Sequence, residues 1–161
     1  MAANDYHFVT NWRFDATIEE VAAILEDVDQ LSTWWASVYL DVKVTEPGNK
    51  DGVGKRVDLL TKGKLPYKLR WSFTVTESNS PDGFTIKAEG DFVGIGTWIL
   101  KQDGPVADVT YDWRIRADKP LLSSLSWLLK PVFRGNHEWA MAQGETCLRQ
   151  ELLDRRRLKS A

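Results

Sequence analysis

The chain has 161 residues, a formal net charge of −2 and 43% apolar residues, which is the size and composition of one globular domain. The near balance of 21 Lys and Arg with 23 Asp and Glu argues against a nucleic-acid binder, because phosphate contacts require a basic excess. One cysteine and two histidines exclude an intramolecular disulfide and a four-ligand Cys/His zinc site.

The first predicted element is a strand over residues 6–14. Tyr6, Phe8, Trp12 and Phe14 share one parity, whereas His7, Val9, Asn11 and Arg13 share the other. This period of two is typical of a strand with one buried face.

Two short helices are expected next. Thr17 and Glu20 have the spacing of a capping box, and apolar residues follow at helical intervals as far as Val28. Residues 29–36 predict one or two further helical turns that carry Trp34 and Trp35. This pair either covers the entrance of a pocket or fixes the short helices to a sheet.

A run of six strand signals fills the middle of the chain. They occur at intervals of roughly ten residues with turn residues and no helices between them, which predicts an antiparallel meander. The predicted strands are 38–45, 56–61, 65–75, 84–89, 91–101 and 106–116.

The last part of the chain is predicted to be helical. Pro120 suits a helix start, whereas Pro131 is expected to break or kink any helix that contains it. A second helical pattern runs from 132 to 153, and basic residues 155–157 complement the dipole at its end. One stripe of this helix holds Phe133, His137, Met141, Gly144, Leu148 and Leu152.

These elements predict an α+β fold in which a curved seven-stranded antiparallel sheet wraps around the long C-terminal helix. A long sheet must cover its apolar face, and this helix is the large element left to do so. Wide side chains on the inward parity, with Gly94, Gly96 and Gly144 nearby, indicate an aromatic pocket or a solid core. They are Trp12, Tyr67, Trp71, Phe73, Tyr111 and Trp113.

Three segments carry a resemblance to a known family: residues 14–21 followed by Trp34 and Trp35, residues 96–100, and residues 109–111. With the element order, they resemble the START and birch-pollen-allergen superfamily (SRPBCC), and within it the bacterial polyketide cyclase/dehydrase-like group. The resemblance covers about residues 6–153. It implies a helix-grip fold with a cavity for apolar or amphipathic small molecules. No catalytic motif of the family carries over to this sequence, so catalytic residues stay unknown.

His137 is the sharpest candidate for chemistry, because histidine is the natural acid or base near neutral pH. It lines a cavity, or it is a half-buried histidine without a role. Cys147 cannot act as its nucleophilic partner, since ten residues of helix span about 15 Å. Tyr67 and Tyr111 are candidate hydrogen-bond donors to a ligand, or core tyrosines. Asp112, Arg114 and Arg116 are expected on the outer face of the sheet.

The leading hypothesis is a cytoplasmic carrier or sensor that binds a small apolar or amphipathic ligand, as one domain over residues 1–161. The alternatives are a polyketide cyclase, aromatase or dehydratase, and a protein-interaction or quinone-handling module that exposes Trp34, Trp35 and Trp127. We expect a monomer or homodimer with no metal, no cofactor, no nucleic acid and no integral membrane association. The predicted ligand-binding residues are Trp12, Trp35, Tyr67, Trp71, Phe73, Tyr111, Trp113, Phe133, His137 and Met141.

Overall fold

The structure is a computed structural model that describes residues 5–64, 68–117 and 120–160, with side chains outside 117–129. Within these ranges the strands are β1 (Asp5–Phe14), β2 (Tyr39–Glu46), β3 (Arg56–Lys62), β4 (Lys68–Ser78), β5 (Gly83–Gly90), β6 (Phe92–Asp103) and β7 (Val106–Ala117). The helical segments are α1 (Ile18–Glu26), η1 (Val28–Gln30), α2 (Leu31–Trp34) and α3 (Pro120–Ser160).

All seven strands form one sheet in the order β1-β7-β6-β5-β4-β3-β2, and each described pairing is antiparallel. The meander predicted for the middle of the chain is therefore confirmed. The register of β1 on β7 places Phe8 opposite Trp113 and Trp12 opposite Val109. The apolar parities of the two strands thus face the same side of the sheet.

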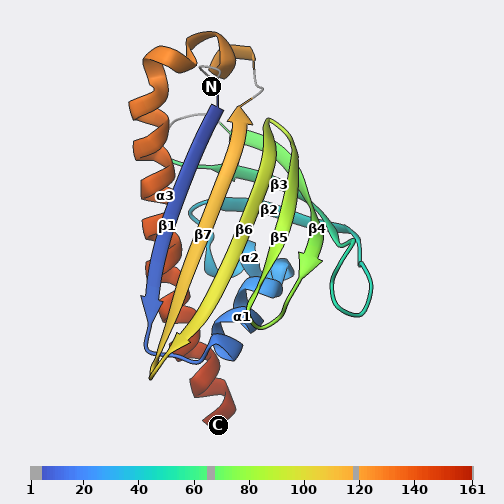
Figure 1. The fold of residues 1–161 in the computed structure, drawn as a ribbon, viewed down its shortest axis with the longest axis vertical. Helices are drawn as coiled ribbons and strands as arrows, with labels where there is room; N and C mark the ends of the chain where they lie inside the picture. The colour runs from blue at the N-terminus through green and yellow to red at the C-terminus, as the bar shows by residue number, and fades with distance from the viewer. Residues whose placement is uncertain (1–4, 65–67, 118–119, 161) are drawn as a thin grey trace.

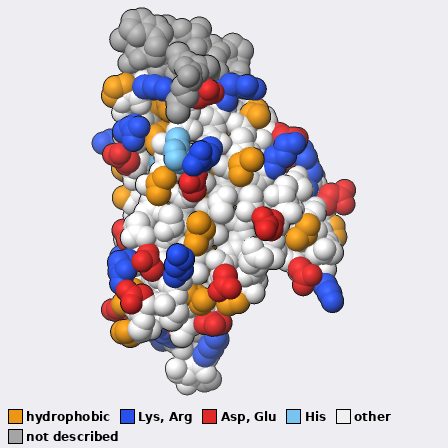
Figure 2. Space-filling model, in the orientation of Figure 1, with side chains coloured by type: hydrophobic (Ala, Val, Ile, Leu, Met, Phe, Trp, Pro, Cys, Tyr) orange, Lys and Arg blue, Asp and Glu red, His pale blue; other side chains and the backbone are white. Residues whose placement is uncertain are grey.

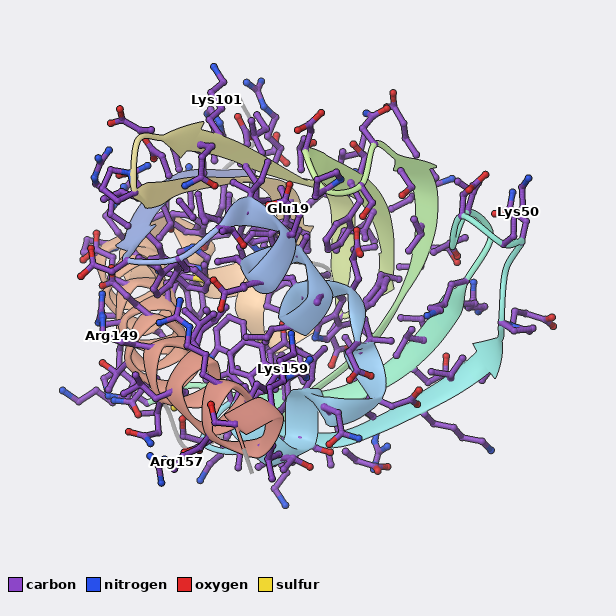
Figure 3. The ribbon with its side chains drawn as sticks, turned by 90° about the horizontal axis from the view of Figure 1, so that it is seen from below. Glu19, Lys50, Lys101, Arg149, Arg157 and Lys159 are labelled. Carbon is purple, nitrogen blue, oxygen red and sulfur yellow. The ribbon has the colours of Figure 1, made fainter. Side chains whose placement is uncertain are left out.

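The sheet curves around α3, as the helix-grip prediction requires. Figure 3 shows the strands as an arc, with α3 on its concave side and α1 within it. In Figure 1 the long part of α3 runs alongside β1. The predicted α+β fold is confirmed.

The convex face of the sheet is mixed, and Figure 2 shows side chains of both charges scattered over it among apolar ones. Arg114 is exposed there and its Nε lies 3.1 Å from a carboxylate oxygen of Asp112. His7 Nε2 lies 3.1 Å from the same oxygen. The predicted outward direction of these charges is confirmed.

The capping box predicted for the first short helix is present in α1. The Thr17 hydroxyl accepts a hydrogen bond from the Glu20 backbone N–H at 3.1 Å, and the Glu20 carboxylate accepts one from the Thr17 backbone N–H, also at 3.1 Å. Val21 and Ile24, which belong to the apolar face of α1, have no exposed surface. This cap therefore fixes where α1 begins and which face it buries.

Helix α3 decides between the two outcomes predicted for Pro131, a break and a kink. The helix is continuous from Pro120 to Ser160 with Pro131 inside it, so the proline does not break it. In Figure 1 the first part of α3 lies across the end of the sheet, and the helix then turns to follow β1. A proline lacks the amide hydrogen for one helical bond, but a kinked helix tolerates that loss.

Helix α3 continues to Ser160, beyond residue 153 where the sequence predicted its end. Ion pairs hold this last part of the helix. Arg156 Nε lies 2.7 Å from the Glu20 carboxylate, and Arg155 reaches Asp27 at 3.2 Å. The basic residues at this end therefore join α3 to α1, in addition to complementing the helix dipole. Among the described residues, no helix has the length and apolar content needed to cross a membrane.

Candidate functional site: an aromatic cavity between the sheet and α3

An unfilled space of about 110 Å³ lies between the sheet and the first half of α3. It is lined by the beginnings of β1, β2 and β4, the C-terminal parts of β3 and β7, side chains of β6, and the segment between α2 and β2. From α3 it is lined by Phe133, Asn136, His137, Ala140 and Met141. The space thus lies at the end of the sheet opposite α1.

The sheet side of the cavity is a continuous series of aromatic rings. Trp98 stacks on Tyr111 with ring centroids 4.1 Å apart and planes inclined by 22°. Tyr111 stacks on Trp113 at 5.6 Å and 21°. Trp113 and Phe92 then both contact Trp71, at 5.6 and 5.7 Å. Trp71 is tilted by 47° from Trp113, and Phe92 stands nearly perpendicular to both, so the rings form a closely packed apolar wall.

Gly96 makes room for this aromatic surface. A Cβ atom at Gly96 would lie 2.6 Å from the Tyr111 hydroxyl oxygen and 2.9 Å from the Trp113 ring. Real Cβ atoms do not approach other atoms so closely, so a larger residue would displace both rings. The glycine thus allows Tyr111 and Trp113 to lie close against β6.

His137 is the polar group that α3 brings to the cavity. Its ring stacks on Phe8 with centroids 4.3 Å apart and planes inclined by 15°. Its Nε2 atom is buried and has no hydrogen-bond partner in the structure. An unpaired nitrogen in an apolar environment is costly, and this one has almost no accessible surface.

The protonation states in the cavity follow from burial. Burial lowers the pKa of His137 to about 4, and the positive charge of Arg134 acts in the same direction. Burial raises the pKa of Tyr111 well above its ordinary value, helped by Tyr39 and Asp112. At neutral pH the cavity therefore presents a neutral imidazole and a neutral phenol.

A buried hydrogen bond fixes one wall of the cavity. The Trp71 indole N–H donates to the Thr61 hydroxyl oxygen at 3.0 Å, and Thr61 is only 5% exposed. The indole would otherwise leave a buried donor without a partner. The bond therefore holds the Trp71 ring in its position between β3 and the cavity.

The same architecture occurs in several solved structures. The protein TTHA0849 from Thermus thermophilus matches with a TM-score of 0.67 and 18% identity, over 89% of this chain and 97% of that one. The Zhui aromatase/cyclase from Streptomyces sp. R1128 matches with a TM-score of 0.68 and 15% identity, over 94% and 95%. Ara h 8.0201 matches with a TM-score of 0.58 and 11% identity, over 93% and 99%.

The chain has the helix-grip fold of the START and birch-pollen-allergen superfamily. At the level of sequence, neither a family model nor a curated protein matches it. The three structures share between 11% and 18% of their residues with this chain, so the likeness establishes the fold alone. The superfamily resemblance seen in the sequence is thereby confirmed as a likeness of structure.

The helix-grip fold brings most of the predicted ligand-binding residues to one place. Those that line the cavity are Trp35, Trp71, Tyr111, Trp113, Phe133, His137 and Met141. Tyr67 lies outside the described residues. That these residues bind a ligand stays a prediction.

Trp12 and Phe73 do not line the cavity, and this corrects their predicted place. Trp12 packs against Trp35 and Trp98 with ring centroids 5.8 and 5.4 Å apart, and those two rings occupy the positions that face the space. Phe73 lies two residues beyond Trp71, farther from the cavity along β4. Both residues have the predicted inward direction, but they belong to the packed core.

Trp34 and Trp35 join α2 to α3. They are 6% and 3% exposed and stack on each other at 5.3 Å. The Trp35 indole N–H donates to the Ala140 carbonyl at 3.2 Å, and its ring occupies the space that Gly144 leaves on α3. The missing side chain of Gly144 therefore makes room for Trp35.

The interaction-module hypothesis placed Trp34, Trp35 and Trp127 on an exposed apolar patch. Burial of the first two contradicts their part in such a patch. The Trp127 side chain lies outside the described residues. The two buried tryptophans therefore serve the fold, and Trp35 also serves as a cavity wall.

Several cavity residues were not predicted, although some had a signal in the sequence. Tyr6 and Phe8 share the inward parity of Trp12, and Trp98 shares that of Gly96. Thr61 and Asn136 had no signal of this kind, because a single polar residue does not reveal its neighbours. The unpredicted lining residues are Tyr6, Phe8, Val38, Tyr39, Thr61, Lys62, Gly63, Leu69, Phe92, Trp98, Ile115, Asn136 and Ala140.

A larger hollow of about 410 Å³ lies at the opposite end of the sheet, between the end of α1, the β2–β3 loop and the β4–β5 turn. Its lining includes the exposed residues Lys50 and Asp51 and the half-buried Lys55, together with Ser78 and Asn79. Lys50 points outward in Figure 3. Water satisfies such a polar surface, so size alone does not make this hollow the better site.

The described residues contain no cluster of three His, Cys, Asp or Glu side chains placed to hold a metal ion. Cys147 is half-buried, and burial raises the pKa of its thiol. A raised pKa keeps the sulfur protonated at neutral pH, which makes it a weak nucleophile. The polar chemistry of the site therefore rests on His137 and its neutral neighbours.

Proposed function

We propose that the protein binds a small apolar or amphipathic molecule in the cavity between the sheet and α3, as a carrier or sensor. The observation that carries this proposal is an unfilled, aromatic-walled space with one unpaired nitrogen, His137 Nε2, buried at its side. Apolar pockets with a few placed polar groups are the usual form of small-molecule sites. The superfamily resemblance of the sequence supports the same reading.

The size of the cavity narrows the ligand. An engineered apolar cavity of about 150 Å³ in another protein binds benzene, and the space here measures about 110 Å³. A single ring is therefore the portion of a ligand that fits inside.

The residues that we propose to contact the ligand are the predicted ones that line the cavity. Trp71 and Trp113 would contact its apolar body from the sheet, and Phe133 and Met141 from α3. His137 would bind its polar end. For Tyr67 we keep the predicted role of a hydrogen-bond donor to the ligand.

The enzyme alternative, a cyclase, aromatase or dehydratase, has less support. Acid–base chemistry near pH 7 works best with groups whose pKa values lie near 7. Burial moves the pKa of His137 down and that of Tyr111 up, so both move away from that range. The name of the Zhui aromatase/cyclase describes that protein, and it shares only 15% of its residues with this chain. Binding without chemistry is the function that the geometry favours.

Two measurements test binding. Native mass spectrometry of protein purified from its own host should detect a bound apolar or amphipathic compound. Titration of the purified protein with toluene should change its tryptophan fluorescence, because Trp35, Trp71, Trp98 and Trp113 line the cavity. A native mass spectrum that shows only the unbound protein, together with no change of tryptophan fluorescence on addition of toluene, would contradict the proposal.

A matched pair of variants locates the site. Trp71→Ala removes a ring of the cavity wall, whereas Trp139→Ala removes a half-buried ring of α3 that is outside the lining. We expect toluene binding to weaken by at least about 5-fold in Trp71→Ala, since one buried aromatic contact is worth about 1 kcal/mol or more. Trp139→Ala should bind like the unmodified protein. Equal losses in both variants would place the site elsewhere.

A further inference from the structure

The end of the molecule that holds the cavity carries an excess of positive charge. The antiparallel register brings the ends of β3 and β7 to the same edge of the sheet as the starts of β1, β4 and β6. At this edge and on the adjoining turns of α3, basic residues outnumber acidic ones among the described residues. The basic ones are Lys62, Lys64, Lys68, Arg116, Lys130 and Arg134, and the acidic ones are Asp5, Glu89 and Asp91.

Several of these cations lack the ion pairs that cations form at the opposite end. Near α1, Arg156 lies 2.7 Å from the Glu20 carboxylate. No carboxylate of the described residues forms an ion pair with the cavity-end residues Lys62, Lys64, Lys130 and Arg134. The chain has a net charge of −2, so this end is positive against the overall charge of the protein. Such a field attracts an anionic partner to this end.

Two of the cations are held over aromatic rings of the cavity wall. Lys130 Nζ lies 5.4 Å from the centroid of the Tyr6 ring, and the guanidinium carbon of Arg134 lies 5.5 Å from that of Phe8. Both rings line the cavity. A ring face attracts a cation and limits its movement, yet Arg134 stays exposed to solvent. The cavity wall thus holds positive charge on the outside of its own end.

The spread of the cations decides what kind of anion fits them. Lys62 ends β3 and Arg116 lies next to the end of β7, and four strand spacings separate these two strands. At about 4.8 Å for each spacing, the two residues are about 19 Å apart along the curved sheet. Arg134 lies on α3, on the concave side. A single carboxylate or phosphate cannot contact cations so far apart, whereas an extended anionic surface can.

The position of the cavity favours a lipid bilayer as that surface. The cavity is apolar and lies at the basic end, and a bilayer is the extended surface in which apolar molecules dissolve. In Figure 1 the first part of α3 crosses this end, and the sequence has no charged residue from 120 to 129. Figure 2 shows Lys and Arg side chains next to the grey residues at the same end. Basic residues around an uncharged segment suit the surface of an anionic membrane.

We propose that the cavity end docks on membranes that contain anionic lipids, with Lys62, Lys64 and Arg134 against the headgroups. Docking by charge needs no ligand in the cavity, so this inference goes beyond the proposed binding function. The attachment is peripheral and reversible, because it depends on charges at the surface. It places the cavity next to the lipid phase, from which an apolar molecule enters with the least exposure to water.

The test is sedimentation of the full chain with lipid vesicles. One set of vesicles contains phosphatidylcholine alone, and the other contains phosphatidylcholine with phosphatidylglycerol, which is anionic. At low ionic strength the protein should sediment with the anionic vesicles and stay in solution with the neutral ones. Salt at about 0.5 M should release it, because salt screens exposed charges.

Two double variants locate the docking surface. Lys64→Gln combined with Arg134→Gln removes two cations of the cavity end. Each basic residue near an anionic surface strengthens binding about 5-fold, so this variant should partition about 30-fold less onto anionic vesicles. Lys101→Gln combined with Lys159→Gln removes the same charge near the opposite end, where both residues are exposed. This control should stay within about 2-fold. Circular dichroism checks that both variants are folded.

The outcomes separate this inference from the binding proposal. No sedimentation with anionic vesicles at low ionic strength would overturn the inference, and so would equal losses in the two double variants. Binding to polyglutamate without binding to vesicles would assign the basic end to an acidic protein, which also overturns it. The lipid comparison uses the unmodified chain, so it decides the inference even if a variant fails to fold. A fluorescence response to toluene without vesicle binding would leave the binding proposal in place.

Discussion

The two ends of the interface between α3 and the sheet differ in how they are filled. At the end near α1, Phe14 and Leu148 are 2% and 0% exposed, and Val21 and Ile24 of α1 have no exposed surface. At the other end, Phe133 and His137 stay partly exposed and border an unfilled space. The same helix and the same sheet thus form a solid core at one end and a cavity at the other.

The difference lies in what the short helices cover. Helix α1 and its neighbour α2 fill the concave side of the sheet only near the lower part of α3 in Figure 1. Trp35, anchored on Ala140 and set against Gly144, stands where the two regions meet. A curved sheet and a single helix about 10 Å wide do not fill the volume between them unless another element intervenes. The cavity is therefore a consequence of the chain order.

The largest effect is expected from a cavity created in the packed end. Leu148→Ala should lower the free energy of unfolding by about 3–5 kcal/mol, because a fully buried leucine loses its contacts and leaves a void. The measurement is urea denaturation followed by circular dichroism. Leu158, which is 77% exposed, is the control, and Leu158→Ala should change little. A loss below about 1 kcal/mol for Leu148→Ala would mean that this end is not solidly packed.

A smaller effect is expected where the two regions meet. Gly144→Ala introduces a Cβ atom that would overlap the Trp35 ring, so it should destabilise the protein by about 1–3 kcal/mol. Gly135 lies on the same helix with no atom near its Cβ position, and Gly135→Ala should stabilise the protein by up to about 1 kcal/mol. Thermal unfolding of both variants measures the contrast. Stabilisation by both substitutions would contradict the contact between Trp35 and α3.

The ion pair that closes the packed end should be visible in the response to acid. The hydrogen bond from Arg156 lowers the pKa of Glu20 to about 2 from 4.5. A carboxylate with a depressed pKa stabilises the fold above pH 4.5, and this contribution is lost as the pH falls towards 2. Glu20→Gln should therefore cost about 1 kcal/mol at pH 7 and almost nothing at pH 2.

The neighbouring carboxylate provides the control for that experiment. Glu19 is exposed, and Glu19→Gln should have a small effect that does not follow the same profile. Urea midpoints measured from pH 7 down to pH 2 give the comparison. A cost of Glu20→Gln that is constant over this range would show that the Arg156 pair does not contribute through its charge.

The smallest effect is expected at the cavity end, where the lowered pKa of His137 predicts that its protonation state does not change near neutral pH. His137 has a pKa of about 4 because of burial and the charge of Arg134, so its imidazole stays neutral between pH 8 and pH 5. The imidazole should titrate only as the pH approaches about 4. NMR spectroscopy of the histidine ring signals at several pH values measures this. A midpoint near 6.5 would indicate a solvated histidine instead.

The sequence predicts the faces of the strands well, because alternation with period two is a local property. The inward directions of Trp71, Tyr111 and Trp113 and the antiparallel meander followed from that pattern. The capping box at Thr17 likewise needed only neighbouring residues. These features depend on chemistry within a few residues of one another.

The position of the cavity along the strands could not be predicted in the same way. Trp12 and Tyr6 share one face of β1, yet Tyr6 lines the cavity and Trp12 does not. What separates them is the register of β1 against α2 and α3, which sets where Trp35 inserts. Thr61 and Asn136 were missed for the same reason, because their hydrogen-bond partners lie elsewhere in the sequence. Thr61 accepts from the Trp71 indole, and Asn136 accepts from the backbone N–H of Lys64.

The most direct test of the contrast between the two ends is a crystal structure determined under xenon pressure, because xenon enters dry apolar cavities. The account predicts a xenon atom in the space bordered by Trp71, Trp113 and Met141, and none around Leu148. A structure in which the aromatic rings fill the space beside Trp71 and no xenon binds there, or in which xenon binds beside Leu148 instead, would contradict the account.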